Sequence, residues 1–262
     1  MISWLKSRPS VLFLTASDER LAAEEPRRFA RVWVGLLVLS GLWGLVTIGL
    51  WELADSLFGQ TGGIYVIPAT VVSVAIVLGF YRRSAEALVN LLASPRPASR
   101  SLVAAMLVVL LVMCLAVLRA DWYRSEVTLP YWVWWVRPES KIYRVLLLTP
   151  LWGAWAMLVL PQFFRPDTSD TPVTAALARG CGPLTTAILM GLLLGGSIGY
   201  FSYLPWTQLT ISGAGILAAI GGGAILLRRK GRMDRDVLLA VNLLTQLVVL
   251  IAFLANRDLR FW

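Results

Sequence analysis

The sequence predicts an all-α protein, a polytopic bundle of about seven transmembrane helices with its N-terminus in the cytoplasm. Three observations predict this fold class. The chain is 58% hydrophobic and 15% charged, whereas soluble domains are about 45–50% apolar and about 25% charged. Its apolar residues form long runs of about the length that crosses a bilayer. Its basic residues gather at the ends of these runs, where they would meet lipid headgroups.

The apolar runs define one membrane domain over residues 32–255, between an N-terminal arm (1–31) and a short tail (256–262). The first run carries no charge and has the length that a spanning helix needs at about 1.5 Å per residue. The fourth run contains Pro150 and ends at Pro161, which predicts a kink or a break. We expect spans at about 32–51, 64–81, 102–118, 145–160, 184–203, 209–227 and 237–255.

Two segments outside the spans have an amphipathic pattern. In the arm, the apolar patch at 11–14 is too short for the core of a signal peptide, and Ser17 and Asp18 can cap a helix that runs to Glu25. We expect the arm to lie on the membrane surface, with a disordered tail as the alternative. Residues 84–93 gather apolar side chains on one helical face. They predict either an interfacial helix or an extension of the second span.

The distribution of charge predicts the orientation. With the N-terminus inside, seventeen Lys and Arg face the cytoplasm and seven face outwards, which satisfies the positive-inside rule. Five of the seven outer basic residues lie in residues 119–144. The short loops and the missing signal peptide favour a bacterial cytoplasmic membrane.

Residues 119–144, which we call the aromatic-basic segment, also hold four of the twelve tryptophans. Trp and Tyr favour the membrane interface, which predicts an aromatic belt, but aromatics and Arg also dominate protein interfaces. A site for a lipid headgroup or a quinone is a third possibility. Residues 127–136 either lie on the surface or re-enter the membrane. The candidates for binding a partner or a headgroup are Trp122, Tyr123, Arg124, Tyr131, Trp132, Trp134, Trp135 and Arg137.

Two later spans carry patterns of small or polar residues. Gly191, Gly195 and Gly199 repeat at four-residue spacing, which favours close packing with another helix, with a mobile gating helix as the alternative. In the last span, Asn242 and Gln246 lie one turn apart on the same face as each other, with Thr245 beside them. Such amides usually bond to neighbouring helices, and lining a solute path is the alternative.

Several chemistries find no support in the sequence. The chain has no histidine, the commonest metal ligand and general base. No ionisable residue falls in the middle of a span, which disfavours a proton-coupled transporter. Cys114 and Cys181 fit no metal or redox spacing, and we expect both to be buried. The pair Asp167 and Asp170 is typical of a turn. We therefore predict no metal and no cofactor.

These patterns lead to three functional hypotheses. The first is a non-catalytic membrane subunit or scaffold that docks a partner through the aromatic-basic segment. The second is a permease subunit for an uncharged or lipid-like solute. The third is a lipid-modifying enzyme, for which Asp121, Arg124 and Glu126 are the clustered candidates. The expected partners are membrane lipids and other membrane subunits, because membrane topology explains the basic charge better than nucleic acid does.

Overall fold

A computed structural model describes residues 8–17, 20–21, 24–58, 66–120, 141–165, 172–200 and 205–256. Every regular element in these ranges is helical, so the predicted fold class is confirmed. η1 is a 3₁₀-helix and η2 is a π-helical turn. The elements are α2 (Pro9–Thr15), η1 (Pro26–Phe29), α4 (Val32–Phe58), α5 (Val66–Leu78), α6 (Arg82–Leu92), α7 (Pro97–Ala120), α9 (Lys141–Phe163), α10 (Pro172–Gly180), α11 (Pro183–Tyr200), α12 (Pro205–Leu217), η2 (Ala218–Gly222), α13 (Gly223–Lys230) and α14 (Arg235–Ala255).

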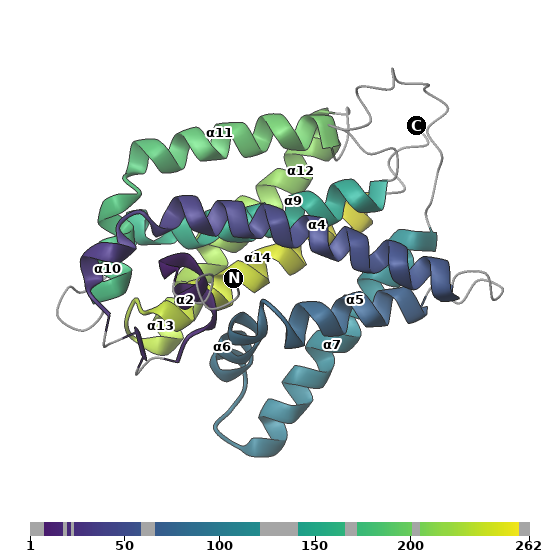
Figure 1. Ribbon diagram of the computed structural model, residues 1–262, viewed down its shortest axis with the longest axis horizontal. Coiled ribbons are helices and arrows are strands. Elements are labelled where there is room, and N and C mark those ends of the chain that lie inside the picture. The colour runs from purple at the N-terminus through teal and green to yellow at the C-terminus, as the bar shows by residue number, and fades with distance from the viewer. Residues whose placement is uncertain are drawn as a thin grey trace.

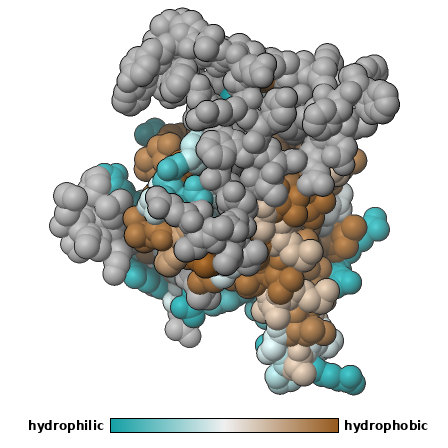
Figure 2. Space-filling view, turned by 90° about the vertical axis from the view of Figure 1, so that its right-hand side faces the viewer, coloured by the Kyte–Doolittle hydropathy of each residue, from teal (hydrophilic) through white to brown (hydrophobic). Residues whose placement is uncertain are grey.

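Two helices, α9 and α14, form the centre of the bundle. Buried residues make up 83% of the apolar span in α9 and 72% of that in α14, against 22–39% in α4, α7 and the α12–α13 span. α4 and α11 pack against α9, and α6 and α12 pack against α14 (Figure 1). The outer helices expose apolar side chains, which form brown areas on the surface in Figure 2. Helices that are apolar on their outer face as well suit a membrane-embedded bundle.

Among the described residues, five helices, or six if one bent pair counts as a single span, are long and apolar enough to cross a membrane, so the prediction of seven spans is not confirmed. Five helices are long and apolar enough to cross a membrane: Val32–Phe58, Pro97–Val117, Tyr143–Phe163, Leu209–Lys230 and Arg235–Ala255. The predicted fifth span is the second part of a helix pair, α10 and α11, that bends by 69°. The predicted second span, α5, has only 13 residues. Such a helix is about 20 Å long, whereas the hydrocarbon core is roughly 30 Å thick.

Of the predicted kink or break in the fourth span, the structure excludes the break, because α9 continues through both Pro150 and Pro161. Proline removes the hydrogen bond to the carbonyl four residues earlier, which for Pro150 is that of Leu146. Gly44 of α4 lies at this carbonyl: a Cβ on Gly44 would be 3.1 Å from the Leu146 oxygen and 3.0 Å from the Leu147 Cα. The glycine therefore lets α4 cover the backbone that proline leaves open.

The first span also extends beyond its predicted end. The predicted span ends at residue 51, but α4 runs on through Glu52 and Asp55 to Phe58. Glu52 is exposed and Asp55 is partly exposed, so neither carboxylate is driven out of the helix by burial.

The two amphipathic segments pack against the bundle. Leu12, Phe13 and Leu14 of α2 are at most 2% exposed, so the apolar side of this part of the arm faces the bundle. α6 is a separate helix after a turn at 79–81, which excludes an extension of the second span. Its apolar face packs against α14 and α2. α2, η1, α6 and α13 thus gather at one end of the molecule, which we call the basic end.

Candidate functional site

The aromatic-basic segment lies outside the described residues between 121 and 140. The eight candidates placed there therefore remain predictions: Trp122, Tyr123, Arg124, Tyr131, Trp132, Trp134, Trp135 and Arg137. The described part of the chain instead directs attention to its centre, where α4, α9 and α14 meet.

Asn242 and Gln246 of α14 lie in this centre and are 0% and 6% exposed. The Gln246 Nε2 donates to the Asn242 Oδ1 at 2.6 Å. The Asn242 Nδ2 donates to the Met157 Sδ of α9 at 3.5 Å. One amide pair thus bonds within its own helix and to the adjacent central helix, the arrangement that usually satisfies amides in spans.

Gly153 of α9 makes room for this amide pair. A Cβ on Gly153 would overlap the Asn242 Oδ1 and would lie 2.8 Å from both the Gln246 Cγ and Nε2. α9 and α14 therefore approach closely at one glycine, and the carboxamides fill the space that a side chain would take.

Polar groups from α4 and from the turn before α6 complete the polar centre. The Tyr81 hydroxyl faces Ser40 and Gln246, and the Trp43 ring lies edge-to-face with Tyr81 at 6.2 Å between centroids. The Ser40 and Tyr81 hydroxyls and the Trp43 Nε1 have no hydrogen-bond partner among the described residues. A buried polar atom without a partner costs about 1–3 kcal/mol, a cost that ordered water can offset.

A small cavity adjoins the polar centre. Its volume is about 30 Å³, and Trp43, Thr47, Thr149 and Gln246 supply the polar part of its lining. That volume suits about one or two water molecules, whereas ligand pockets measure roughly 300–1,000 Å³. In this conformation the Gln246 amide faces a water-sized space.

Thr245, the third residue predicted for a solute path, is 0% exposed, and its hydroxyl has no hydrogen-bond partner among the described residues. Thr245 directly precedes Gln246 in the sequence, but it does not line the small cavity. The three predicted residues are therefore buried together, but only Gln246 reaches a space.

Two glycines of the predicted stripe, Gly191 and Gly195, make no close contact with another described helix. A Cβ on Gly191 or Gly195 would meet no described atom within 4 Å, and for Gly199 only the helical backbone is described. α11 instead bonds to α9 beside the stripe: the Trp152 Nε1 donates to the Ser197 Oγ at 3.1 Å. Close packing occurs at other described glycines, among them Gly44, Gly153, Gly215 and Gly223.

The two cysteines are buried and free, as expected. Burial raises the pKa of the Cys181 thiol, and its contact with Thr186 opposes this rise. A protonated, buried thiol is a poor nucleophile. Among the described residues, no group of three or more Cys, Asp or Glu side chains is placed to hold a metal ion.

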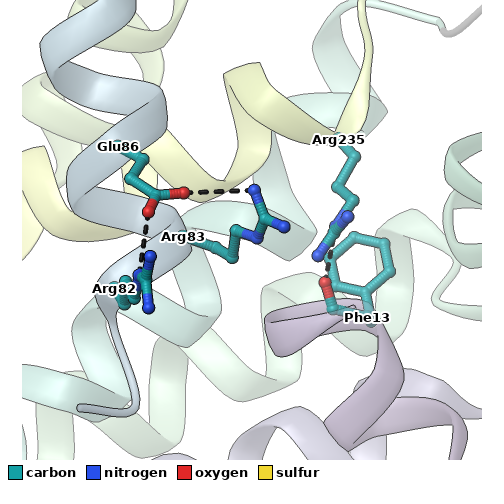
Figure 3. A network of polar contacts seen from close by, with 5 residues as sticks. All are labelled: Phe13, Arg82, Arg83, Glu86 and Arg235. Atoms are coloured by element: carbon teal, nitrogen blue, oxygen red, sulfur yellow. Dashed lines mark hydrogen bonds and ion pairs between the residues drawn. The ribbon is translucent and has the colours of Figure 1, made fainter. Parts of the chain in front are cut away.

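A second polar region lies at the basic end, where α14 holds α2. The Arg235 Nε donates to the Phe13 carbonyl at 2.7 Å, and its guanidinium carbon lies 6.0 Å from the Phe13 ring centroid. Nearby on α6, Glu86 accepts from both Arg82 and Arg83 at 2.9 and 3.1 Å (Figure 3). These arginines border a depression of about 240 Å³ between α2 and the start of α6.

Comparison of the chain with protein-family models, curated proteins and solved structures gives no match. The function is therefore argued from the geometry of the described residues and from the sequence.

Proposed function

We propose that this protein is a non-catalytic integral membrane subunit, a scaffold that holds a partner through its aromatic-basic segment. The observation that carries the proposal is the closed polar centre. The groups best suited to a solute path, Asn242 and Gln246, bond to each other and to Met157. Of the two, only Gln246 lines a cavity, and its volume is only about 30 Å³.

The described ionisable groups support the same interpretation. The carboxylates with described ion pairs, Glu24, Glu86, Asp234 and Asp236, pair with Arg or Lys near the basic end. None of them adjoins the polar centre or a pocket of ligand size. Paired surface charges contribute little beyond local stability, and they give no acid–base pair for catalysis.

The outer helices offer surface for partners. Val34, Val38 and Leu42 of α4 and Leu184 and Leu192 of α11 are between 47% and 74% exposed. Apolar faces of this extent mark contact with membrane or protein. Membrane lipids and other membrane subunits are therefore the proposed partners, and the bacterial cytoplasmic membrane is the proposed location.

The docking part of the proposal is tested by co-purification. The full chain is extracted in mild detergent with its partners, and Trp132, Trp134 and Trp135 are replaced together by Ala. We expect the triple variant to lose partners that the unchanged chain retains. In a matched variant the same three tryptophans are replaced by Phe, which keeps the aromatic area and should retain the partners. If the unchanged chain purifies alone, or if the tryptophan variant keeps every partner, the docking role is wrong.

The scaffold role is tested separately against permeation. Vesicles that contain the purified chain are exposed to glycerol or urea gradients, and swelling is followed by light scattering. We expect the same rate as in protein-free vesicles, because the centre is closed. Faster swelling that Gln246→Leu abolishes would replace the scaffold with a permease.

A further inference from the structure

A large apolar groove runs between α6, α7 and α14. Its volume is about 710 Å³ and its lining is entirely apolar, including Leu88 and Leu92 of α6, Val103, Met106 and Met113 of α7, and Leu247 of α14. The groove exists because α7 packs mainly against α5 and makes fewer contacts with α6 and α14. Figure 1 shows α7 running away from α14 towards its own first residue.

The depth of the groove matches one half of a bilayer. On α7 it extends from Val103 to Met113, which is about 15 Å at 1.5 Å per residue. The full hydrocarbon core measures roughly 30 Å. A helix of another subunit would need a groove along the whole span, whereas the acyl chains of one leaflet fit a groove of this depth.

The end of the groove carries unpaired positive charge. Arg96 and Arg100 flank the start of α7, are exposed, and form no ion pair with a described carboxylate. Arg100 precedes the groove residue Val103 by three positions, so both lie on one helical face. Residues 87–120 contain no Asp or Glu. In Figure 2 the projecting lower part of the molecule, where α7 begins, is hydrophobic along its length and hydrophilic at its tip.

A third arginine fixes the same end of the groove. The Arg229 Nη1 donates to the carbonyls of Leu91 and Leu92 at 3.1 and 3.3 Å, and so closes the last turn of α6. Leu92 itself lines the groove. The part of the groove near Arg96 and Arg100 is thus stabilised by α13 as well as by the turn that joins α6 to α7.

We propose that this groove binds an anionic phospholipid, with its acyl chains between α7 and α14 and its headgroup phosphate at Arg96 and Arg100. A zwitterionic lipid would fill the apolar part equally well but would gain less from the arginines. Each basic residue near a headgroup favours an anionic lipid by about fivefold, hence roughly 25-fold for the pair. The site is independent of the proposed docking segment, which belongs to the opposite side of the predicted topology.

The test measures lipid binding to the purified full chain by native mass spectrometry. The probes are dioleoyl phosphatidylglycerol, dioleoyl phosphatidylcholine and free glycerol 3-phosphate. We expect phosphatidylglycerol to bind about 25-fold more tightly than phosphatidylcholine, and glycerol 3-phosphate not to compete. Replacing Arg96 and Arg100 with Gln should abolish the preference. In a matched control, Arg27→Gln and Arg31→Gln remove two exposed charges, one in η1 and one just before α4. This pair should leave the preference for phosphatidylglycerol unchanged.

A second variant tests the groove itself. Ala105→Trp places a large side chain at an exposed position inside the groove and should weaken binding of both lipids, whereas Ile188→Trp on the exposed face of α11 should not. Equal binding of the two lipids would overturn the proposal. So would equal effects of the two arginine pairs, unchanged binding in Ala105→Trp, or competition by glycerol 3-phosphate. Thermal unfolding of each variant separates loss of binding from loss of folding.

Discussion

At the scale of single residues, Gly153 decides how α9 meets α14. The backbones approach so closely that any side chain on Gly153 would overlap the Asn242 amide. Glycine is a poor helix former because it loses the most backbone freedom on folding. Its presence at position 153 is therefore explained by the lack of room for a side chain and not by helix propensity.

We predict that Gly153→Ala destabilises the protein by about 1–3 kcal/mol, the usual cost of overpacking. The added Cβ would force the Asn242 and Gln246 side chains apart and break their hydrogen bond. The measurement is the thermal unfolding midpoint in detergent, which should fall. Gly191→Ala is the matched control, because a Cβ there meets no described atom within 4 Å, and its midpoint should stay or rise slightly. Equal midpoints for the two variants would contradict the packing.

The sequence predicts half of this centre. The four-residue separation of Asn242 and Gln246 places both on one face of a helix, which the structure confirms with a hydrogen bond. Their partners Gly153 and Met157 could not be found in the same way, because the register between two helices depends on side chains all along both. In α4, the pattern of small residues could have predicted the packed face: its buried positions include Ser40, Gly44 and Thr47, which repeat at helical spacing.

At the scale of elements, Arg235 ties the N-terminal helix to the bundle. Its side chain reaches from the first turn of α14 to the last turns of α2, and the residue is only 9% exposed. Carbonyls at the end of a helix lack partners within the helix, so an arginine there both satisfies a carbonyl and holds α2 in place.

We predict that Arg235→Ala loosens α2 from the bundle. A hydrogen bond to a charged group contributes about 1.5–3 kcal/mol, which corresponds to roughly a 10- to 100-fold faster amide exchange if α2 opens locally. Hydrogen–deuterium exchange of residues 9–15 provides the measurement. Arg232→Ala is the control, because Arg232 is 58% exposed and contacts Asp234 at 3.6 Å, and it should leave this exchange unchanged. Protection that persists in Arg235→Ala would show that apolar burial alone holds α2.

The helices themselves were largely predictable, whereas their partners were not. The apolar face of residues 84–93 correctly predicts a helix, and that face packs mainly against α14. Hydrophobic periodicity reports which face is apolar, but bilayer and protein are apolar alike. The same ambiguity explains α5, where apolar composition predicts a span that the helix length does not reach.

At the scale of the whole molecule, the arrangement of charge predicts the orientation in the membrane. The basic end collects arginines from η1, α6 and α13, and the positive-inside rule places such an end in the cytoplasm. Two exposed serines, one at the basic end and one at the opposite end of the molecule, can test this orientation. Ser94 lies in the turn between α6 and α7, and Ser56 lies in the last turn of α4.

We predict that Ser56→Cys reacts with a membrane-impermeant maleimide in intact cells, and that Ser94→Cys reacts only after the membrane is opened. α4 crosses from the basic end to the opposite end, so the two positions should lie on opposite sides. Both native cysteines are buried, so the unchanged chain should give little background and serves as the control. The Ser94 contact to Ser99 uses the Ser94 backbone N–H and survives the substitution. The reverse pattern would invert the topology, and it would move the arginine-rimmed groove to the outer leaflet.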